Sequence, residues 1–228
     1  MGDVISMLDR PVYQYAEVDR LLRLTPGTAK RWINGYQRDG RWYEPVIREV
    51  TSDSTWVTWG EFTETRLLAE FRSSIPMIKL RPAVGWLRER FDTPHPLAFA
   101  RPFLEPDGRE LLLAAQRETG VDEELWLAVP SAQGALLTAT SRRFVQSVHY
   151  PDTVGLSEYV IADPATPHVV FDPRQRQGQP TVNGIRAETL AGLVAGGEPI
   201  DFVASTYDLA AEQVEQAVAY EASCRRAA

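Results

Sequence analysis

Apolar residues in two neighbouring stretches near the N-terminus recur at three- and four-residue spacing, the period of a helix with one buried face. The first stretch has its apolar positions at Tyr15, Val18, Leu21 and Leu22. The second runs from Thr25 to Tyr36, where Thr25 can cap the free amides of the first turn and Pro26 fits the first helical position. The pattern predicts a helix, a tight turn and a second helix.

The second predicted helix separates apolar from polar side chains. Its inward positions are Ala29, Trp32, Ile33 and Tyr36, and its outward positions are Gly27, Thr28, Arg31, Asn34 and Arg38. Small, basic and amide side chains suit the DNA major groove, because Arg and Asn can donate paired hydrogen bonds to base edges. The alternative is a solvated helix face. The predicted DNA-binding residues are Thr25, Thr28, Lys30, Arg31, Asn34, Arg38 and Arg41.

Extended segments follow this helix after Gly40. We expect 41–48 and 55–59 to pair as a hairpin, which would form the wing of a winged helix-turn-helix. Trp42, Trp56 and Trp59 could stack on bases, but aromatic residues in strands are usually part of the core. We therefore assign all three tryptophans a structural role.

Helical periodicity returns from Phe62 to Phe71 and in short pieces that start at Pro76 and Pro82, and a first domain is expected to cover 1–92. In the next stretch, 97–104 and 109–116 resemble paired strands around a turn at 105–108. The pattern at 140–148 fits either a helix or a strand. The expected second domain, 93–166, is a β-rich middle segment.

The C-terminal domain, 167–228, has clearer signals for where its helices start and end. A strand at 168–171 precedes predicted helices at 187–195, 199–203 and about 210–222, with Gly196 and Gly197 ending the first. The last helix carries Glu212, Glu215 and Glu221, which would repel the phosphate backbone. This three-helix, helix-turn-helix-like domain therefore suits a protein partner, and the overall class expected is α+β.

Charge is distributed unevenly along the chain. Eight Arg and Lys residues face four acids between Arg10 and Arg48, a net charge of 8 − 4 = +4. Because the whole chain carries −7, the remainder carries −7 − 4 = −11. A basic N-terminal segment suits DNA, and an acidic remainder suits another partner.

Composition excludes several classes of site. The chain has neither a membrane-length apolar run nor a secretory-signal pattern, so we expect a cytoplasmic protein. Its single cysteine, Cys224, and the scattered His95, His149 and His168 predict no disulfide and no metal site. No local nucleophile motif or phosphate loop is present, so no catalytic residue, cofactor or enzymatic activity is predicted, although a triad assembled in space would escape this test.

Two parts of the chain resemble known families. The helices at 15–36 with the predicted wing resemble the N-terminal unit of MerR-like winged helices, without the long coiled coil of those regulators. The segment from Phe171 to Glu221 resembles the small antitoxin domain of bacterial toxin–antitoxin operons, on the motif residues Gly178, Pro180, Gly184 and Gly197 and the glutamate-bearing run 212–221. The family's cap residue before the last helix is replaced here by 209–210, which are Leu and Ala. Together the two parts resemble long VapB-type antitoxins.

The resemblance implies a type II antitoxin that binds its operator as a homodimer and masks a PIN-like ribonuclease with a carboxylate metal site. Guanidinium groups could enter such a site, because they pair well with carboxylates. The toxin-binding candidates are Arg174, Arg176, Arg225 and Arg226. A solvated loop and a disordered terminus are the alternatives for these residues. The alternative function is a stand-alone winged-helix transcriptional regulator without a toxin.

Overall fold

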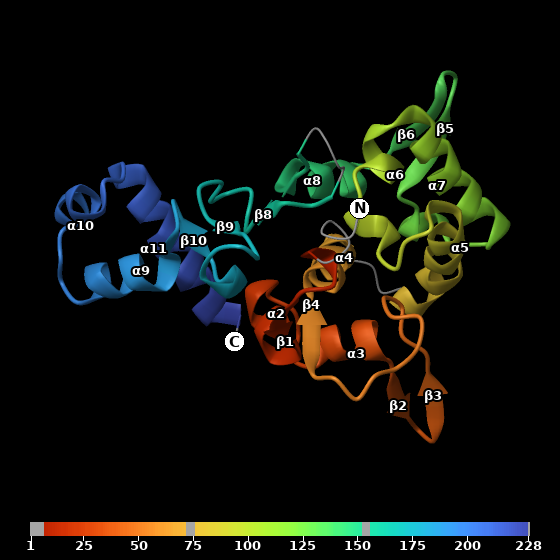
Figure 1. The fold of residues 1–228 in the computed structure, drawn as a ribbon, viewed down its shortest axis with the longest axis horizontal. Coiled ribbons are helices and arrows are strands. Elements are labelled where there is room, and N and C mark those ends of the chain that lie inside the picture. The colour runs from red at the N-terminus through yellow and green to blue at the C-terminus, as the bar shows by residue number, and fades with distance from the viewer. Residues whose placement is uncertain (1–6, 72–75, 152–155, 228) are drawn as a thin grey trace.

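A computed structural model describes residues 7–71, 76–151 and 156–227, without the side chains of 226 and 227. It shows an elongated molecule that mixes helices and strands, which confirms the α+β class (Figure 1). The last three helices form one end, the helices between 81 and 118 form the other, and the N-terminal elements lie between them with the helix at 139–147. No helix in the described ranges is long and apolar enough to cross a membrane.

The N-terminal elements are short and closely spaced. They are β1 (Pro11–Gln14), α2 (Tyr15–Leu21), α3 (Thr28–Asn34), β2 (Tyr36–Arg38), β3 (Arg41–Tyr43), β4 (Trp56–Thr58) and α4 (Trp59–Ala69). Both helices expected between 15 and 36 are present, and α4 covers the helix expected from Phe62. These elements place two short helices directly before a small hairpin.

The predicted hairpin between 41–48 and 55–59 is wrong, because each strand has another partner. β4 pairs antiparallel with β1, and β3 pairs antiparallel with β2. Asp39 and Gly40 join β2 to β3, and both have positive φ, as a two-residue turn of the type that favours Asp-Gly requires. The hairpin therefore begins five residues earlier than expected, at Tyr36.

The middle segment contains more helix than the sequence pattern predicted. Before it, η1 (Met77–Leu80) and α5 (Arg81–Phe91) confirm the short helical pieces expected from Pro76 and Pro82. The elements of the middle segment are η2 (Pro96–Ala98), α6 (Arg101–Leu104), α7 (Pro106–Glu118), η3 (Glu123–Leu125), β5 (Ala128–Ser131), β6 (Gly134–Leu137), α8 (Ala139–Ser147), β7 (Val148–His149) and β8 (Tyr159–Ile161). The strands predicted at 97–104 and 109–116 are wrong. Pro106 occupies the first turn of α7, and a Cβ on Gly108 would lie 2.0 Å from the carbonyl oxygen of Arg101. The residues that suggested a turn instead start a helix and let it approach α6.

The remaining elements confirm the helices expected near the C-terminus. They are β9 (Val170–Phe171), η4 (Arg176–Gly178), β10 (Thr181–Val182), β11 (Ile185–Arg186), α9 (Ala187–Ala195), α10 (Ile200–Tyr207) and α11 (Ala211–Ala227). A five-stranded antiparallel sheet has the order β11-β10-β9-β8-β7. This sheet takes strands from both sides of the boundary predicted at 166, and the domain limits stay predictions.

A chain of aromatic rings joins the first segment to the last. Tyr13 and Phe62 have ring centroids 4.6 Å apart, Phe62 meets the edge of Phe171 at 5.3 Å, and Phe171 meets Tyr220 at 6.2 Å. All four side chains are fully buried, and the Tyr13 hydroxyl donates to the carbonyl of Gly178. The N-terminal helices are therefore held against the C-terminal helices through one continuous core.

Candidate nucleic-acid interface

The start of α3 is set by an acid on the preceding helix. The carboxylate of Asp19, which is buried, accepts from the backbone N–H of Gly27 at 2.6 Å and of Ala29 at 2.8 Å. These bonds satisfy amides that a helix leaves free at its N-terminus. The predicted start at Thr25 and its capping role are wrong, and Thr25 lies exposed in the turn. A buried acid on the apolar face of α2 was the available signal for this cap.

One face of α3 is packed and the other carries free cations. Ala29 and Ile33 are fully buried, as expected, whereas Thr28 is also buried although it was assigned to the outward face. Lys30 and Arg31 are exposed. The Thr28 hydroxyl accepts from the Arg31 guanidinium at 2.7 Å, so it orients Arg31. The outward basic face is thus smaller than predicted and centres on Lys30 and Arg31.

The side chain of Asn34 forms hydrogen bonds within the protein. Its side-chain oxygen accepts from the Arg48 guanidinium at 3.0 Å and from the N–H of Ser52 at 2.8 Å, and its amide nitrogen donates to the Ser52 carbonyl at 2.9 Å. Arg48 also forms an ion pair with Glu61, whose side chain is 6% exposed. Asn34 therefore fixes the loop after β3. Arg48, which no sequence pattern marks as special, organises that loop.

The hairpin of β2 and β3 extends from the end of α3 and projects away from the other elements (Figure 1). Gly35 is required at its base, because it has φ +74° and a Cβ there would lie 2.6 Å from the carbonyl oxygen of Tyr43. Tyr36 and Tyr43 stack with centroids 4.8 Å apart. This close packing fixes the direction of the hairpin relative to α3.

Basic and aromatic side chains are exposed on this hairpin. Arg38 and Arg41 are both exposed, Arg38 within β2 rather than in the helix, and Arg41 lies over the ring of Tyr43 at 5.3 Å. The core role predicted for the tryptophans is confirmed for Trp59, which is fully buried, and wrong for Trp42 and Trp56, which are 46% and 48% exposed. The hairpin thus presents cations and an indole ring to its surroundings.

The structure brings four of the predicted DNA-binding residues onto α3 and the adjoining hairpin as exposed cations: Lys30, Arg31, Arg38 and Arg41. Two other cations of the basic segment are paired internally, Arg23 with Asp163 and Arg48 with Glu61. Exposed cationic side chains that no buried carboxylate neutralises are the ones available to phosphate groups. We call these four residues the basic face.

The toxin-binding candidates are separated by the structure. Arg174 donates to both carboxylate oxygens of Asp172 and pairs with Glu158, and these bonds raise the pKa of its guanidinium. Arg176 is exposed and donates to the Gly184 carbonyl at 3.0 Å. Arg225 is exposed at the end of α11, and the side chain of Arg226 lies outside the described residues. Arg174 is 46% exposed but is held by two carboxylates, whereas Arg176 and Arg225 are exposed and form no ion pair among the described residues.

Comparisons with known proteins cover almost the whole chain. It is 41% identical to the uncharacterised protein Rv2308 of Mycobacterium tuberculosis, over 98% of this chain and 95% of that one. It is 26% identical to the putative antitoxin VapB45 of the same organism, over 92% and 93% of the two chains. The crystal structure of Rv2018 from M. tuberculosis superposes with a TM-score of 0.73 at 25% identity and covers 93% of this chain.

The fold and the site define an α+β protein with a basic helix pair and hairpin at one end of the sequence and a small helical unit at the other. Residues 169–220, which form most of that helical unit, match the family model DUF433, described as a protein of unknown function. The identity to Rv2308 extends beyond this unit to the N-terminal helices. The chain belongs to the same family as Rv2308.

Proposed function

We propose that this protein is a type II antitoxin that binds operator DNA through the basic face and binds a cognate PIN-like ribonuclease through its C-terminal helices. The observation that carries the proposal is the combination of the exposed cations on α3 and its hairpin with near full-length similarity to a putative antitoxin. Neither half of that combination alone separates an antitoxin from a general regulator.

The DNA-binding half of the proposal is supported by how α3 is held. Its buried face packs through Ala29 and Ile33, and its N-terminus is fixed by Asp19, so the exposed Lys30 and Arg31 stand on a rigid element. Rigid placement limits the entropy lost on binding. A homodimer would present two such helices to two half-sites of an operator.

The toxin-binding half is supported by the charge of the last three helices. Between residues 187 and 224 the chain has seven acids and no Lys or Arg. Such a surface repels the phosphate backbone and suits a basic protein surface. Arg176 and Arg225 flank this acidic unit, and we propose that they pair with carboxylates of the toxin's metal site.

The test compares two variants, each of which should lose one of the two binding activities and keep the other. Lys30→Ala/Arg31→Ala should lose retention of the DNA upstream of its gene in a gel shift but still capture the adjacent gene product in a pull-down and rescue growth. Arg176→Ala/Arg225→Ala should show the reverse. Arg117→Ala, which removes an exposed cation of α7, is the control. Loss of both activities in either variant, or retention of both activities in either variant, would contradict the division of roles.

The second candidate is a stand-alone transcriptional regulator, which is favoured by the same basic face. A regulator would bind the upstream DNA normally, and no neighbouring gene product would be captured or neutralised. The pull-down therefore distinguishes the two functions without depending on the DNA-binding result.

A further inference from the structure

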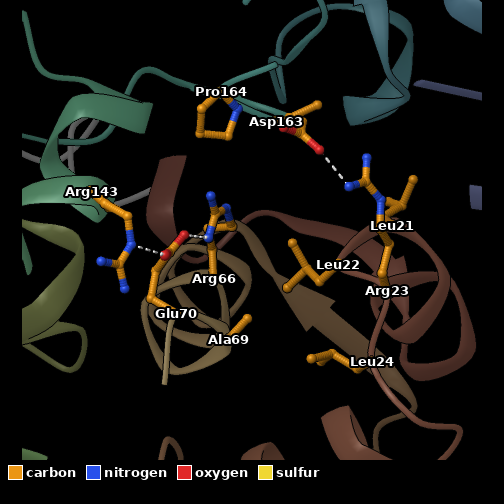
Figure 2. Close-up of a pocket in the computed structure, with 11 residues that line it drawn as sticks. Leu21, Leu22, Arg23, Leu24, Arg66, Ala69, Glu70, Arg143, Asp163 and Pro164 are labelled. Atoms are coloured by element: carbon orange, nitrogen blue, oxygen red, sulfur yellow. Dashed lines mark hydrogen bonds and ion pairs between the residues drawn. The ribbon is translucent and has the colours of Figure 1, made fainter. Parts of the chain in front are cut away.

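A polar cavity of about 690 Å³ opens where the N-terminal elements meet the middle segment (Figure 2). Its wall comes from the turn after α2, the last turns of α4, helix α8 and the residues that follow β8. Small-molecule sites commonly measure about 300–1,000 Å³. The cavity is large enough for an organic ligand, and none of the four residues of the basic face lines it.

Three guanidinium groups and two carboxylates line this cavity. Arg66 and Arg143 both bond to Glu70, the latter at 3.1 Å, and Arg23 pairs with Asp163. One carboxylate therefore serves two guanidinium groups, and the lining carries 3 − 2 = +1 in a chain of −7. Figure 2 shows the three arginines approaching from different elements. The lining of this cavity is therefore positive, although the chain as a whole is acidic.

Arg66 and Arg23 are the two less exposed arginines of this lining, at 8% and 30%. Arg66 bonds to Glu70, and the buried Nε of Arg23 has no hydrogen-bond partner in the described part of the chain. A guanidinium has five N–H donors, and a nearly buried donor without an acceptor costs free energy. An oxyanion in the cavity would supply the missing acceptors, since guanidinium groups match carboxylate and phosphate in geometry.

We propose that this cavity binds a small organic ligand through a phosphate or carboxylate group seated against Arg66 and Arg143. The apolar body of the ligand lies along Leu22 and Leu24, which line the same cavity. The site is a recess with charged and apolar walls, so it suits a compact ligand better than a segment of a protein. This inference does not depend on the proposed antitoxin function.

The test is isothermal titration of the full-length protein with pyrophosphate and, separately, with citrate, at constant ionic strength. Low millimolar anion avoids the general stabilisation that phosphate salts give to folded proteins. We expect saturable binding at one site, weakened about tenfold or more in Arg143→Met by the loss of a charge-assisted bond. Arg117→Met, which removes an exposed cation outside the cavity, should bind like the native protein.

Arg143 is the primary substitution because its side chain is 50% exposed and Arg66 keeps Glu70 as a partner without it. Arg66→Met is the second variant, and its fold is checked by circular dichroism. The tighter of the two anions identifies the oxyanion class. The inference is overturned if neither anion saturates, if Arg117→Met weakens binding as much as Arg143→Met, or if a glutamate peptide binds more tightly than both anions.

Discussion

Arg48 shows how much of the interface rests on a single side chain. Its guanidinium contacts both oxygens of Glu61, the Tyr15 hydroxyl at 2.8 Å and the backbone carbonyl of Trp56 at 2.7 Å. With its bond to Asn34, it links the start of α2, the end of α3 and the start of α4. The planar fork of an arginine can serve these acceptors together, and a lysine cannot.

Replacing Arg48 by Met is expected to destabilise the protein by about 3–5 kcal/mol, because Glu61 would keep a buried charge without its partner. Arg48→Met/Glu61→Gln should recover a large part of that loss. Urea unfolding of the three proteins measures both effects. A loss below about 1 kcal/mol in the single variant would show that the pair is not a main support of this region.

His95 predicts a pH dependence of stability. Burial alone would lower the pKa of its ring, but the hydrogen bond to Glu64 and the charges of Glu64, Glu61 and Asp9 outweigh burial and raise the pKa above 6.5. The ring nitrogens lie 3.4 Å from Glu64 and 3.6 Å from Asp9. Because the folded pKa is the higher one, the stabilisation is complete below pH about 6.5 and is lost as the pH rises through the folded pKa.

The free energy of unfolding of the native protein should therefore fall relative to that of His95→Gln as the pH is raised from 6 to 9. Urea unfolding of both proteins at several pH values measures this difference. Gly60 allows the ring to sit here, since a Cβ would lie 2.4 Å from it, so Gly60 is left unchanged. Parallel pH profiles for the two proteins would contradict the assigned ion pairs.

At the scale of elements, local signals predicted the C-terminal helices well. The expected bounds of α9 are correct because Gly196 and Gly197 follow its last residue, and Pro199 precedes α10. The cap of α3 could not be predicted in the same way, because Asp19 lies eight and ten residues from the amides that it binds. Periodicity predicts that a helix exists, whereas a non-local cap decides where it starts.

Strand pairing was the least predictable level of structure. β4 pairs with β1, about 45 residues earlier, and no local pattern records that partner. The pairing of β2 with β3 did have a signal, the dipeptide Asp39-Gly40, which favours a two-residue hairpin. In the middle segment, a proline and a glycine at 106 and 108 are equally compatible with a turn and with the first turn of a helix, and tertiary packing decides between them.

The hairpin itself is predicted to contribute phosphate contacts. Arg38→Ala/Arg41→Ala should weaken binding to all DNA sequences and reduce the slope of log affinity against log salt by about 2, since each phosphate contact contributes roughly 0.9. Stability should change by less than about 0.5 kcal/mol, because both side chains are exposed. Fluorescence anisotropy in a salt series measures the slope, and an unchanged slope would remove the hairpin from the interface.

At the scale of the whole molecule, the aromatic chain from Tyr13 to Tyr220 makes the segments interdependent. Trp59 adds to it, because its indole N–H donates to the carbonyl of Ser157 at 2.8 Å. The N-terminal elements that carry the basic face thus share a core with Phe171, a residue of the DUF433 region. Charge distinguishes the N-terminal segment from the C-terminal segment, while packing joins them.

Phe171→Ala is expected to cost about 3–5 kcal/mol, as for other fully buried phenylalanines. Tryptophan fluorescence and far-UV circular dichroism should move together to a lower guanidinium midpoint. Phe202→Ala is the matched control, because Phe202 is 56% exposed on α10 and should change stability little. Separate transitions for the two probes would show that the segments unfold independently.

The central claim is that α3 recognises operator DNA, and the affinity of the upstream DNA for the Lys30→Ala/Arg31→Ala protein tests it most directly. Fluorescence anisotropy at fixed salt would compare the upstream fragment with a scrambled one. The native protein and Arg117→Ala should prefer the upstream fragment, and the double variant should bind it at least about tenfold more weakly and lose the preference. Equal affinity of the native protein and the double variant for the upstream fragment would contradict the account.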